Sequence, residues 1–118
     1  MPYVDGYVLP VPKKNLKAYS ALARKAGKIW KEHGALEYRE CSGDDLKGMF
    51  GVTFPKSVKA KKDETIVFSW IVFKSKQHRN SVNAKVMKDS RIANMDPNKM
   101  PFDHRRMLYG GFKTMVDL

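Results

Sequence analysis

Two phenols and a carboxylate near the start of the chain have the types and the spacing for proton-transfer chemistry. Asp5 lies between Tyr3 and Tyr7 in an alternating run, so a strand places all three side chains on one face. Partial burial raises the pKa of a carboxylate toward neutrality, which suits a general base, and phenols can orient a substrate. We therefore predict Asp5 as a catalytic base, with Tyr3 and Tyr7 binding the substrate. Pairing of Asp5 with a nearby Lys or Arg at the end of the sheet is the structural alternative.

Two aromatic residues later in the chain are further candidates for contact with a ligand. Trp70 lies in "TIVFSWIVF", and its ring could stack on a ligand or fill the core of a dimer. Tyr109 opens the stretch "YGGF", whose bare glycine backbone could approach a ligand, although a bulge in an edge strand explains it equally well. We predict Trp70 and Tyr109 as substrate-binding residues.

The histidines and the single cysteine do not predict a metal site. His33, His78 and His104 are too far apart for a local pattern such as two histidines four residues apart on a helix. Cys41 is the only cysteine, which excludes an internal disulfide and a multi-cysteine metal centre. The sequence contains no glycine-rich phosphate loop and no serine nucleophile elbow, so it names no cofactor.

The strands that must position these residues follow from alternation. Residues 65–73 carry no charge, and alternate side chains on both faces of this run are apolar. The first run of the chain places Val4, Gly6 and Val8 on one face, which is small enough for a helix to approach closely. We therefore expect this small face against a helix and the face with the phenols toward a cavity.

The other elements follow from periodicity and from capping residues. Residues 16–33 repeat apolar positions at spacings of three and four, which predicts an amphipathic helix that ends at Gly34. A second helix is expected after Ser75. Further strands are expected at 35–41 and 107–116.

The order strand, helix, strand, strand, helix, strand is that of the ferredoxin-like fold. We therefore predict one α+β domain over residues 1–118, with a four-stranded antiparallel sheet and both helices on one face. The strands at 3–9 and 65–73 are expected at the centre of the sheet and parallel to each other. The long connection at 46–63 is expected to form a lid, a binding loop or a mobile segment.

The second face of this sheet has no cover within the chain other than the long connection. Leaving two or three large side chains exposed forfeits about 1.5 to 3 kcal/mol each, so such a surface usually marks an interface or a ligand groove. A second copy packed sheet to sheet is the simplest cover. We predict a homodimer with a small-molecule cavity between or beside the sheets.

Composition limits the remaining classes of function. No apolar run approaches the ~20 residues needed to cross a bilayer, so no membrane partner is predicted. The first residues lack the basic and apolar regions of a secretory signal, and a lone cysteine fits a reducing compartment. A cytoplasmic location is therefore expected.

RNA binding is the rival class of function, because the net charge of +11 favours adhesion to polyanions. The RNA recognition module has the same order of elements but needs basic and aromatic residues together on its third strand. No basic residue lies between Lys62 and Lys74. Any binding of nucleic acid is therefore expected to be nonspecific.

Several motifs in order carry a family resemblance over nearly the whole chain: "YVDGYVLPVPKKNLKAY", "ALEYREC", "VFSWIVFKSK", "VNAKVM", and "MPFD" followed by "YGGF". On these motifs the chain resembles the YbaA-like family of small bacterial proteins, which has no established function. The resemblance implies membership of the dimeric α+β barrel superfamily, in which two ferredoxin-like subunits join their sheets.

The resemblance also implies candidate chemistry. Several monooxygenases of that superfamily use a polar residue of the first strand, often Asn, with a Trp of the third strand and a His of the second helix. Similar positions here are Asp5 or Tyr7, Trp70 and His78, although an Asp where an amide is usual changes charge and hydrogen-bond donation. The resemblance thus implies Asp5 and His78 as catalytic residues of a cofactor-independent oxidation or proton transfer. A stress-associated accessory protein without catalysis is the alternative.

Overall fold

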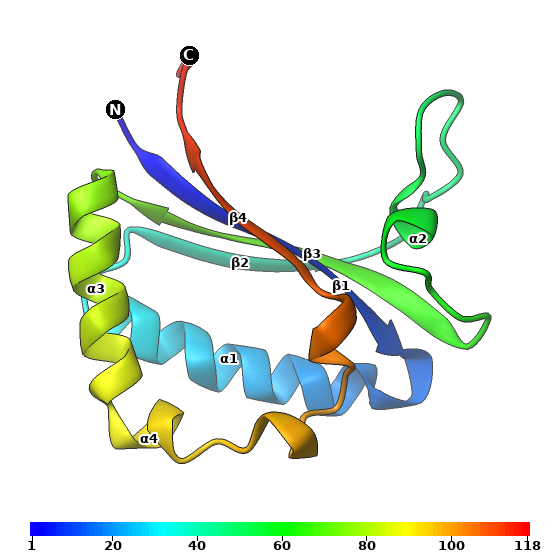
Figure 1. Ribbon diagram of the computed structural model, residues 1–118, viewed down its shortest axis with the longest axis horizontal. Coiled ribbons are helices and arrows are strands. Elements are labelled where there is room, and N and C mark those ends of the chain that lie inside the picture. The colour runs from blue at the N-terminus through cyan, green and yellow to red at the C-terminus, as the bar shows by residue number, and fades with distance from the viewer.

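The chain forms one curved sheet with its two longest helices on a single face (Figure 1). This computed structural model describes residues 1–118. The strands are β1 (Tyr3–Pro12), β2 (Glu37–Ser42), β3 (Glu64–Phe73) and β4 (Leu108–Lys113). The helices are α1 (Leu16–Glu32), α2 (Phe54–Ser57), α3 (Lys76–Lys88) and α4 (Ser90–Ala93). The predicted ferredoxin-like α+β fold with a four-stranded antiparallel sheet is confirmed.

The four strands lie in the order β2-β3-β1-β4, and every neighbouring pair is antiparallel. β1 and β3 occupy the centre as predicted, but the prediction that these two run parallel is wrong. α1 carries the chain from β1 past β3 to β2, so the strand parallel to β1 is β2, at the edge of the sheet. β3 then returns between them and pairs with both in antiparallel register.

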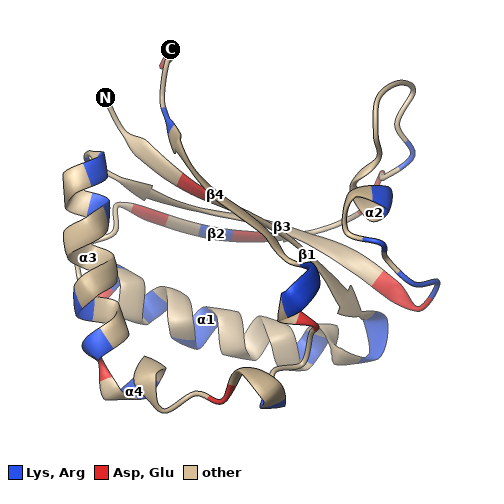
Figure 2. Cartoon of the chain, in the orientation of Figure 1, with Lys and Arg blue, Asp and Glu red and all other residues tan.

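α1 is amphipathic, and its apolar side packs on the sheet. Tyr19, Ala23 and Ile29 are buried, whereas the lysines and the arginine of this helix are exposed to solvent. Gly27 permits close packing, because a Cβ atom there would lie 2.6 Å from the ring of Tyr38 on β2. Basic residues also occur on α2, α3 and the loops, so the positive charge is spread over several elements (Figure 2).

α3 begins at a side-chain cap, as the sequence predicted. Ser75 Oγ accepts a hydrogen bond from the backbone N–H of His78 at 3.1 Å. Val82 and Val86 are buried in one core cluster with Phe73 of β3. None of the helices is both long enough and apolar enough to span a membrane.

The two faces of β1 are the reverse of the prediction. Tyr3 and Asp5 are buried on the face that carries the helices, with exposed fractions of 8% and 0%. Val4 and Val8 lie on the opposite face, which we call the open face. The physical reason is that Arg79 of α3 supplies an ionic partner for Asp5, which allows the polar side of the strand to be buried.

The long connection between β2 and β3 covers only one end of the open face. Val58 is buried there, and the ring of Phe54 lies 5.9 Å from that of Phe68 between centroids. Met49 and Phe50 near the tip of the connection stay exposed. The rest of the open face therefore has no cover from this chain, as the alternation in β3 predicted.

Candidate functional site

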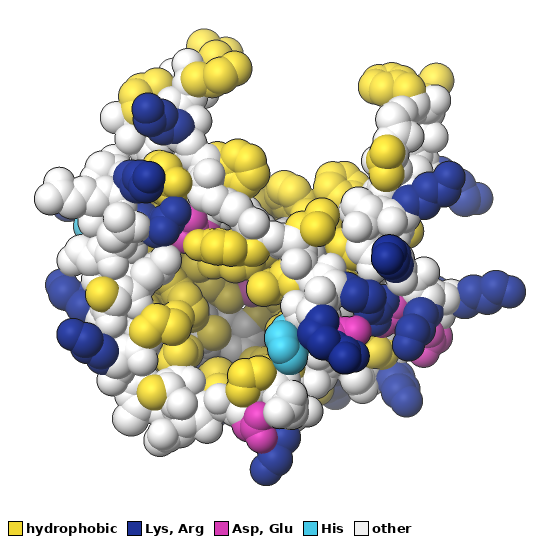
Figure 3. Space-filling view, in the orientation of Figure 1, with side chains coloured by type: hydrophobic (Ala, Val, Ile, Leu, Met, Phe, Trp, Pro, Cys, Tyr) yellow, Lys and Arg dark blue, Asp and Glu magenta, His cyan; other side chains and the backbone are white.

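A cavity of about 210 Å³ lies between the helix face of the sheet and the helices. Figure 3 shows a hollow surrounded by hydrophobic side chains. One wall comes from α1, through Leu22, Ala23, Ala26 and Trp30. The other wall is apolar and comes from α4 and the segment before β4: Ile92, Met95, Met100, Phe102 and Met107. The hydroxyl and carboxylate groups lie on the sheet, apart from the hydroxyl of Tyr19 on α1.

A row of polar side chains crosses the sheet beneath this cavity. Tyr7 of β1 lies opposite Ser69 of β3, and Ser69 lies opposite Glu40 of β2. Directly opposed residues of antiparallel strands hold their Cβ atoms about 4.5 to 5.5 Å apart, so these side chains are neighbours. Tyr109 of β4 extends the row, with its ring centroid 5.0 Å from that of Tyr7. We call Tyr7, Ser69 and Glu40 the polar floor, because all three line the cavity.

Two phenols hold Glu40 in place. Tyr19 of α1 donates a hydrogen bond to Glu40 Oε1 at 2.6 Å, and Tyr38 donates to Oε2 at 2.5 Å. Burial, and then the charge of Glu40, raises the pKa of both phenols, so both stay protonated at neutral pH. Glu40 is therefore a fixed hydrogen-bond acceptor at the edge of the polar floor.

A second polar cluster lies between β1 and α3. Asp5 is fully buried, and its Oδ1 lies 3.2 Å from Nε of Arg79. Asn83 donates to Asp5 Oδ2 at 3.4 Å and accepts a hydrogen bond from Trp30 Nε1 at 3.0 Å. Arg79 also donates to the hydroxyl of Tyr3 at 3.1 Å. These contacts link the buried carboxylate to both long helices.

The environment of Asp5 disfavours its charge. Burial raises the pKa of Asp5 above its ordinary value, and the charge of Arg79 offsets only part of that rise. Asp5 Oδ1 and Arg79 Nε form an ion pair, but neither atom makes a hydrogen bond. Asp5 is not among the residues that line the cavity, so an occupant would meet the polar floor first.

Four of the predicted site residues come together on the helix face. Tyr3 and Asp5 gather around Arg79, and Tyr7 stacks on Tyr109 in the neighbouring row of the sheet. The sequence predicted these four as a substrate-binding and catalytic group. Only Tyr7 among them lines the cavity.

Trp70 and His78 lie apart from that group. Trp70 is on the open face, where its Nε1 donates to Glu37 at 2.9 Å and Arg39 lies 5.9 Å from the centre of its ring. His78 Nδ1 accepts a hydrogen bond from the backbone N–H of Lys74 at 3.0 Å, in the turn before α3. His78 therefore completes the start of a helix, and Trp70 is separated from the cavity by the sheet.

The sequence did not identify Glu40, Tyr38 or Arg79 as site residues. Tyr38 and Glu40 are two positions apart in "ALEYREC", so the same alternation that grouped Asp5 with its phenols places them on one face. Arg79 gave no comparable signal, because a basic residue in a basic helix looks like part of its solvated side.

The donor set of the site is oxygen-rich and small. No group of three or more His, Cys, Asp or Glu side chains lies together as a metal centre. Cys41 is free and exposed. The groups offered to an occupant of the cavity are the hydroxyls and the carboxylate of the polar floor.

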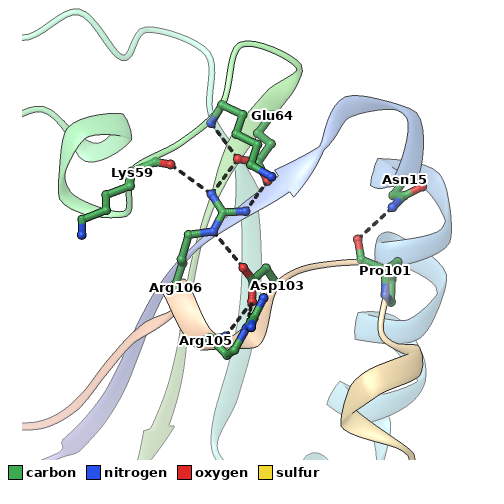
Figure 4. Close-up of polar contacts among 8 residues, drawn as sticks. Asn15, Lys59, Glu64, Pro101, Asp103, Arg105 and Arg106 are labelled. Atoms are coloured by element: carbon green, nitrogen blue, oxygen red, sulfur yellow. Dashed lines mark hydrogen bonds and ion pairs between the residues drawn. The ribbon is translucent and has the colours of Figure 1, made fainter.

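Residues 89–107, which we call the cover segment, form the outer wall of the cavity. At one end Arg106 donates to the two carboxylate oxygens of Glu64 at 2.8 and 2.7 Å (Figure 4). At the other end Arg91 donates to Glu32 at 2.7 Å. The pair formed by Arg106 is largely shielded from solvent and therefore strong, whereas the exposed pair formed by Arg91 contributes little, so the cover segment is held mainly at its end near β4.

The open face carries a shallow apolar groove of about 700 Å³. Side chains from β4, β1 and β3 form rows across it, such as Leu108, Val8 and Phe68. Phe68, Leu108 and Phe112 keep 43%, 46% and 60% of their surface exposed. These are large fractions for apolar side chains on a sheet, and Glu37 is the only charged residue that lines the groove.

The fold and the cavity define a ferredoxin-like α+β protein with a pocket between its sheet and its helices. An uncharacterised NIPSNAP domain protein from Burkholderia xenovorans has the same fold, with a TM-score of 0.60 at 12% identity over 97% of this chain and 95% of that one. A dimeric ferredoxin-like protein from an uncultured marine organism has a TM-score of 0.59 at 9% identity over 100% of both chains. At such identities the likeness shows the fold alone.

The chain belongs to the family described as "Protein of unknown function (DUF1428)", whose model matches residues 2–104. It is 43% identical over 117 residues to the uncharacterised protein YbaA of Escherichia coli strain K12, covering 99% of each chain. YbaA of Shigella flexneri matches with the same identity and coverage. The resemblance seen in the motifs is confirmed, and the descriptions of these relatives name no activity.

Proposed function

We propose that this chain binds a small organic molecule in the cavity between the sheet and the helices. The observation that carries the proposal is a polar floor inside an otherwise apolar cavity, which is the usual composition of a small-molecule site. Ser69 and Glu40 offer polar groups to one end of a molecule, whereas Trp30 and Phe102 offer flat apolar surface to the rest. Cavities that stay empty in proteins are typically apolar on all sides.

Filling the cavity tests this proposal. Ala26→Leu adds carbon atoms to the cavity wall, whereas Ala21→Leu adds the same atoms at an exposed position of the same helix. Binding of 2-phenylethanol, measured by saturation-transfer NMR, is expected to weaken roughly tenfold or more for Ala26→Leu and to stay unchanged for Ala21→Leu. Equal binding by the two variants would contradict a site in this cavity.

We also propose that two copies of the chain join through their open faces. The marine protein with this fold is described as dimeric, and exposed side chains such as Phe68 and Phe112 provide the apolar surface that such a contact needs. Sedimentation velocity at micromolar concentration is expected to show a dimer, and Phe112→Glu is expected to give a monomer. Met87→Glu, at an exposed position of α3, is the control and should leave the dimer intact. A well-behaved monomer of the unaltered chain would rule out this contact.

Proton transfer is a second candidate function, with Asp5 as the base predicted from the sequence. It requires a substrate that comes within hydrogen-bond reach of Asp5, which is fully buried and does not line the cavity. The raised pKa of Asp5 favours it, and so does its Oδ1, which makes no hydrogen bond. Cofactor-independent oxidation of an enolisable molecule is a reaction of this type that the resemblance implies. His78 and Trp70 have no direct part in it, because both lie away from the cavity.

Replacing the base distinguishes catalysis from structure. Deuterium exchange beside the carbonyl of phenylacetone, followed by NMR, reports proton abstraction. Asp5→Asn is expected to abolish this exchange, and a melting temperature that stays nearly unchanged would favour a catalytic role for Asp5. A large loss of stability instead would favour a structural role for the ion pair between Asp5 and Arg79.

A further inference from the structure

The cavity contains one charged side chain and no cation. Glu40 is the only Asp, Glu, Lys, Arg or His among the residues that line it, in a chain whose formal net charge is +11. None of the ion pairs of the chain includes Glu40. Glu40 also lines an open groove beside this cavity together with Lys13, Lys17 and Arg24, but none of these forms an ion pair with it. A ligand that supplies the opposite charge would therefore give this partly buried carboxylate its first ion-pair partner.

The hydrogen bonds of Glu40 leave room for a donor from a ligand. Each carboxylate oxygen accepts one phenol O–H, from Tyr19 and from Tyr38. An ionised carboxylate can accept about four hydrogen bonds, so each oxygen keeps one position free. The phenols also fix the orientation of the carboxylate, so these positions are held without any ligand present.

Aromatic rings form much of the surrounding wall. Tyr19 meets Phe102 edge to face at 5.5 Å between centroids, and Trp30 lies 6.3 Å from Tyr38. All four rings line the cavity, and Tyr7 adds a fifth from the floor. The faces of such rings attract cations, and organic ammonium groups are commonly bound in aromatic cages.

We propose that the cavity binds an organic cation, with an apolar body against the aromatic wall and an ammonium group whose N–H groups bond to Glu40. This inference rests on the proposed small-molecule function of the same cavity and names its ligand class. The volume of about 210 Å³ corresponds to the liquid volume of about seven water molecules, which suits a ligand with one ring and a short aminoalkyl chain. An anionic ligand would meet a carboxylate and find no cation to balance its own charge.

Three probes of similar size test the ligand class on the unaltered chain: 2-phenylethylammonium, 2-phenylethanol and phenylacetate. NMR titration at neutral pH is expected to show that the ammonium binds roughly tenfold or more tightly than the alcohol, the effect of a hydrogen bond to a charged group. Phenylacetate is expected not to bind in the cavity. Because the chain as a whole is basic, nonspecific attraction would favour phenylacetate, so the expected order cannot come from the surface charge.

Two variants of the same strand then assign the preference to one carboxylate. Glu40→Gln keeps the shape of the side chain and is expected to bring the ammonium and alcohol affinities within about twofold of each other. Glu37→Gln is the matched control, because Glu37 bonds to Trp70 on the open face, and it should leave the preference unchanged.

The outcomes separate the ligand class from the proposed function. Binding of the alcohol without a preference for the ammonium would overturn the organic-cation inference and leave the small-molecule site standing. A preference that survives Glu40→Gln would overturn the role of Glu40. Absence of binding by all three probes would overturn the inference together with the proposed function.

Discussion

The two faces of the sheet are built from the same strands yet hold opposite kinds of side chain. The helix face buries Asp5 fully and Glu40 in part, whereas the open face exposes apolar groups such as Phe68 and Phe112. The helices make this possible because they bring polar partners to the sheet, as Arg79 does for Asp5. The open face has no second layer of its own chain. The difference teaches that one face is covered within a single molecule, whereas the other leaves large apolar side chains uncovered by its own chain.

Removal of one arginine from each face is expected to give the largest difference in lost unfolding free energy between the two faces. Arg79→Met leaves Asp5 fully buried without a cation, and breaking such a pair costs roughly 3 to 5 kcal/mol of unfolding free energy. Arg39→Met breaks an exposed contact with Glu37 at 3.8 Å and an exposed cation–π contact with Trp70, for which roughly 1 kcal/mol or less is expected. Urea denaturation of both variants measures the difference. Equal losses of unfolding free energy in the two variants would show that the buried Asp5 does not require Arg79 for the stability of the helix face.

The loss caused by Arg79→Met is expected to shrink as the pH falls. Burial raises the pKa of Asp5, and removal of Arg79 takes away the charge that lowers it. A carboxyl group with a raised pKa in the folded chain stabilises it below the unfolded pKa, and this contribution is lost as the pH rises through the folded pKa. Denaturation curves from neutral pH down to about pH 4 should therefore show the variant approaching the unaltered chain. If the difference in unfolding free energy between Arg79→Met and the unaltered chain grows as the pH falls, the raised pKa of Asp5 is contradicted.

The uncovered face could be predicted from the sequence because it depends only on local alternation. "TIVFSWIVF" has apolar side chains on both faces whichever strands lie beside it. The order of the elements was equally local, since Gly34 and Ser75 mark helix ends without reference to distant residues. The fold class and the exposed groove therefore followed from short stretches of the chain.

The polar floor could not be predicted in the same way, because its partners are far away in the sequence. Tyr19 and Glu40 are 21 positions apart, and Tyr3 and Arg79 are 76 positions apart. Without these partners the polar face of β1 looked too polar to be buried under helices, and its small apolar face looked suited to helix packing. The reversed faces of β1 and the missed contact of Glu40 with Tyr19 thus have one cause, whereas Tyr38 lies two positions from Glu40 and could have been grouped with it.

A pair of glycines is expected to give the next largest difference between the faces. Gly27→Ala would place a Cβ atom 2.6 Å from the ring of Tyr38, and such overpacking typically costs roughly 1 to 3 kcal/mol. Gly6→Ala adds a Cβ atom 3.4 Å from Phe112 on the open face, so little change in unfolding free energy is expected. Thermal unfolding compares the two variants. A loss for Gly6→Ala as large as that for Gly27→Ala would mean that the open face is packed as tightly as the helix face.

Replacement of the two tryptophans, one on each face, is expected to give the smallest difference in lost unfolding free energy. Trp30→Phe removes the donor to Asn83, which itself bonds to Asp5, so roughly 1 to 2 kcal/mol should be lost from the folded chain. Trp70→Phe removes only the bond from Nε1 to Glu37 on the open face, and less than about 1 kcal/mol is expected for a separated chain. Denaturation of both variants at low protein concentration measures these losses.

Protein concentration sharpens this last contrast, because a partner that binds only the folded chain adds stability by mass action. If a second copy covers the open face, the loss caused by Trp70→Phe grows as the concentration rises from about 1 to 100 μM. The loss caused by Trp30→Phe should stay constant, since all its contacts lie within one chain. The loss of stability caused by Trp70→Phe and the melting temperature of the unaltered chain could both prove independent of protein concentration. In that case no second copy covers the open face, and this face stays in contact with water. The helix face would keep its cavity in that case, because none of its partners comes from another molecule.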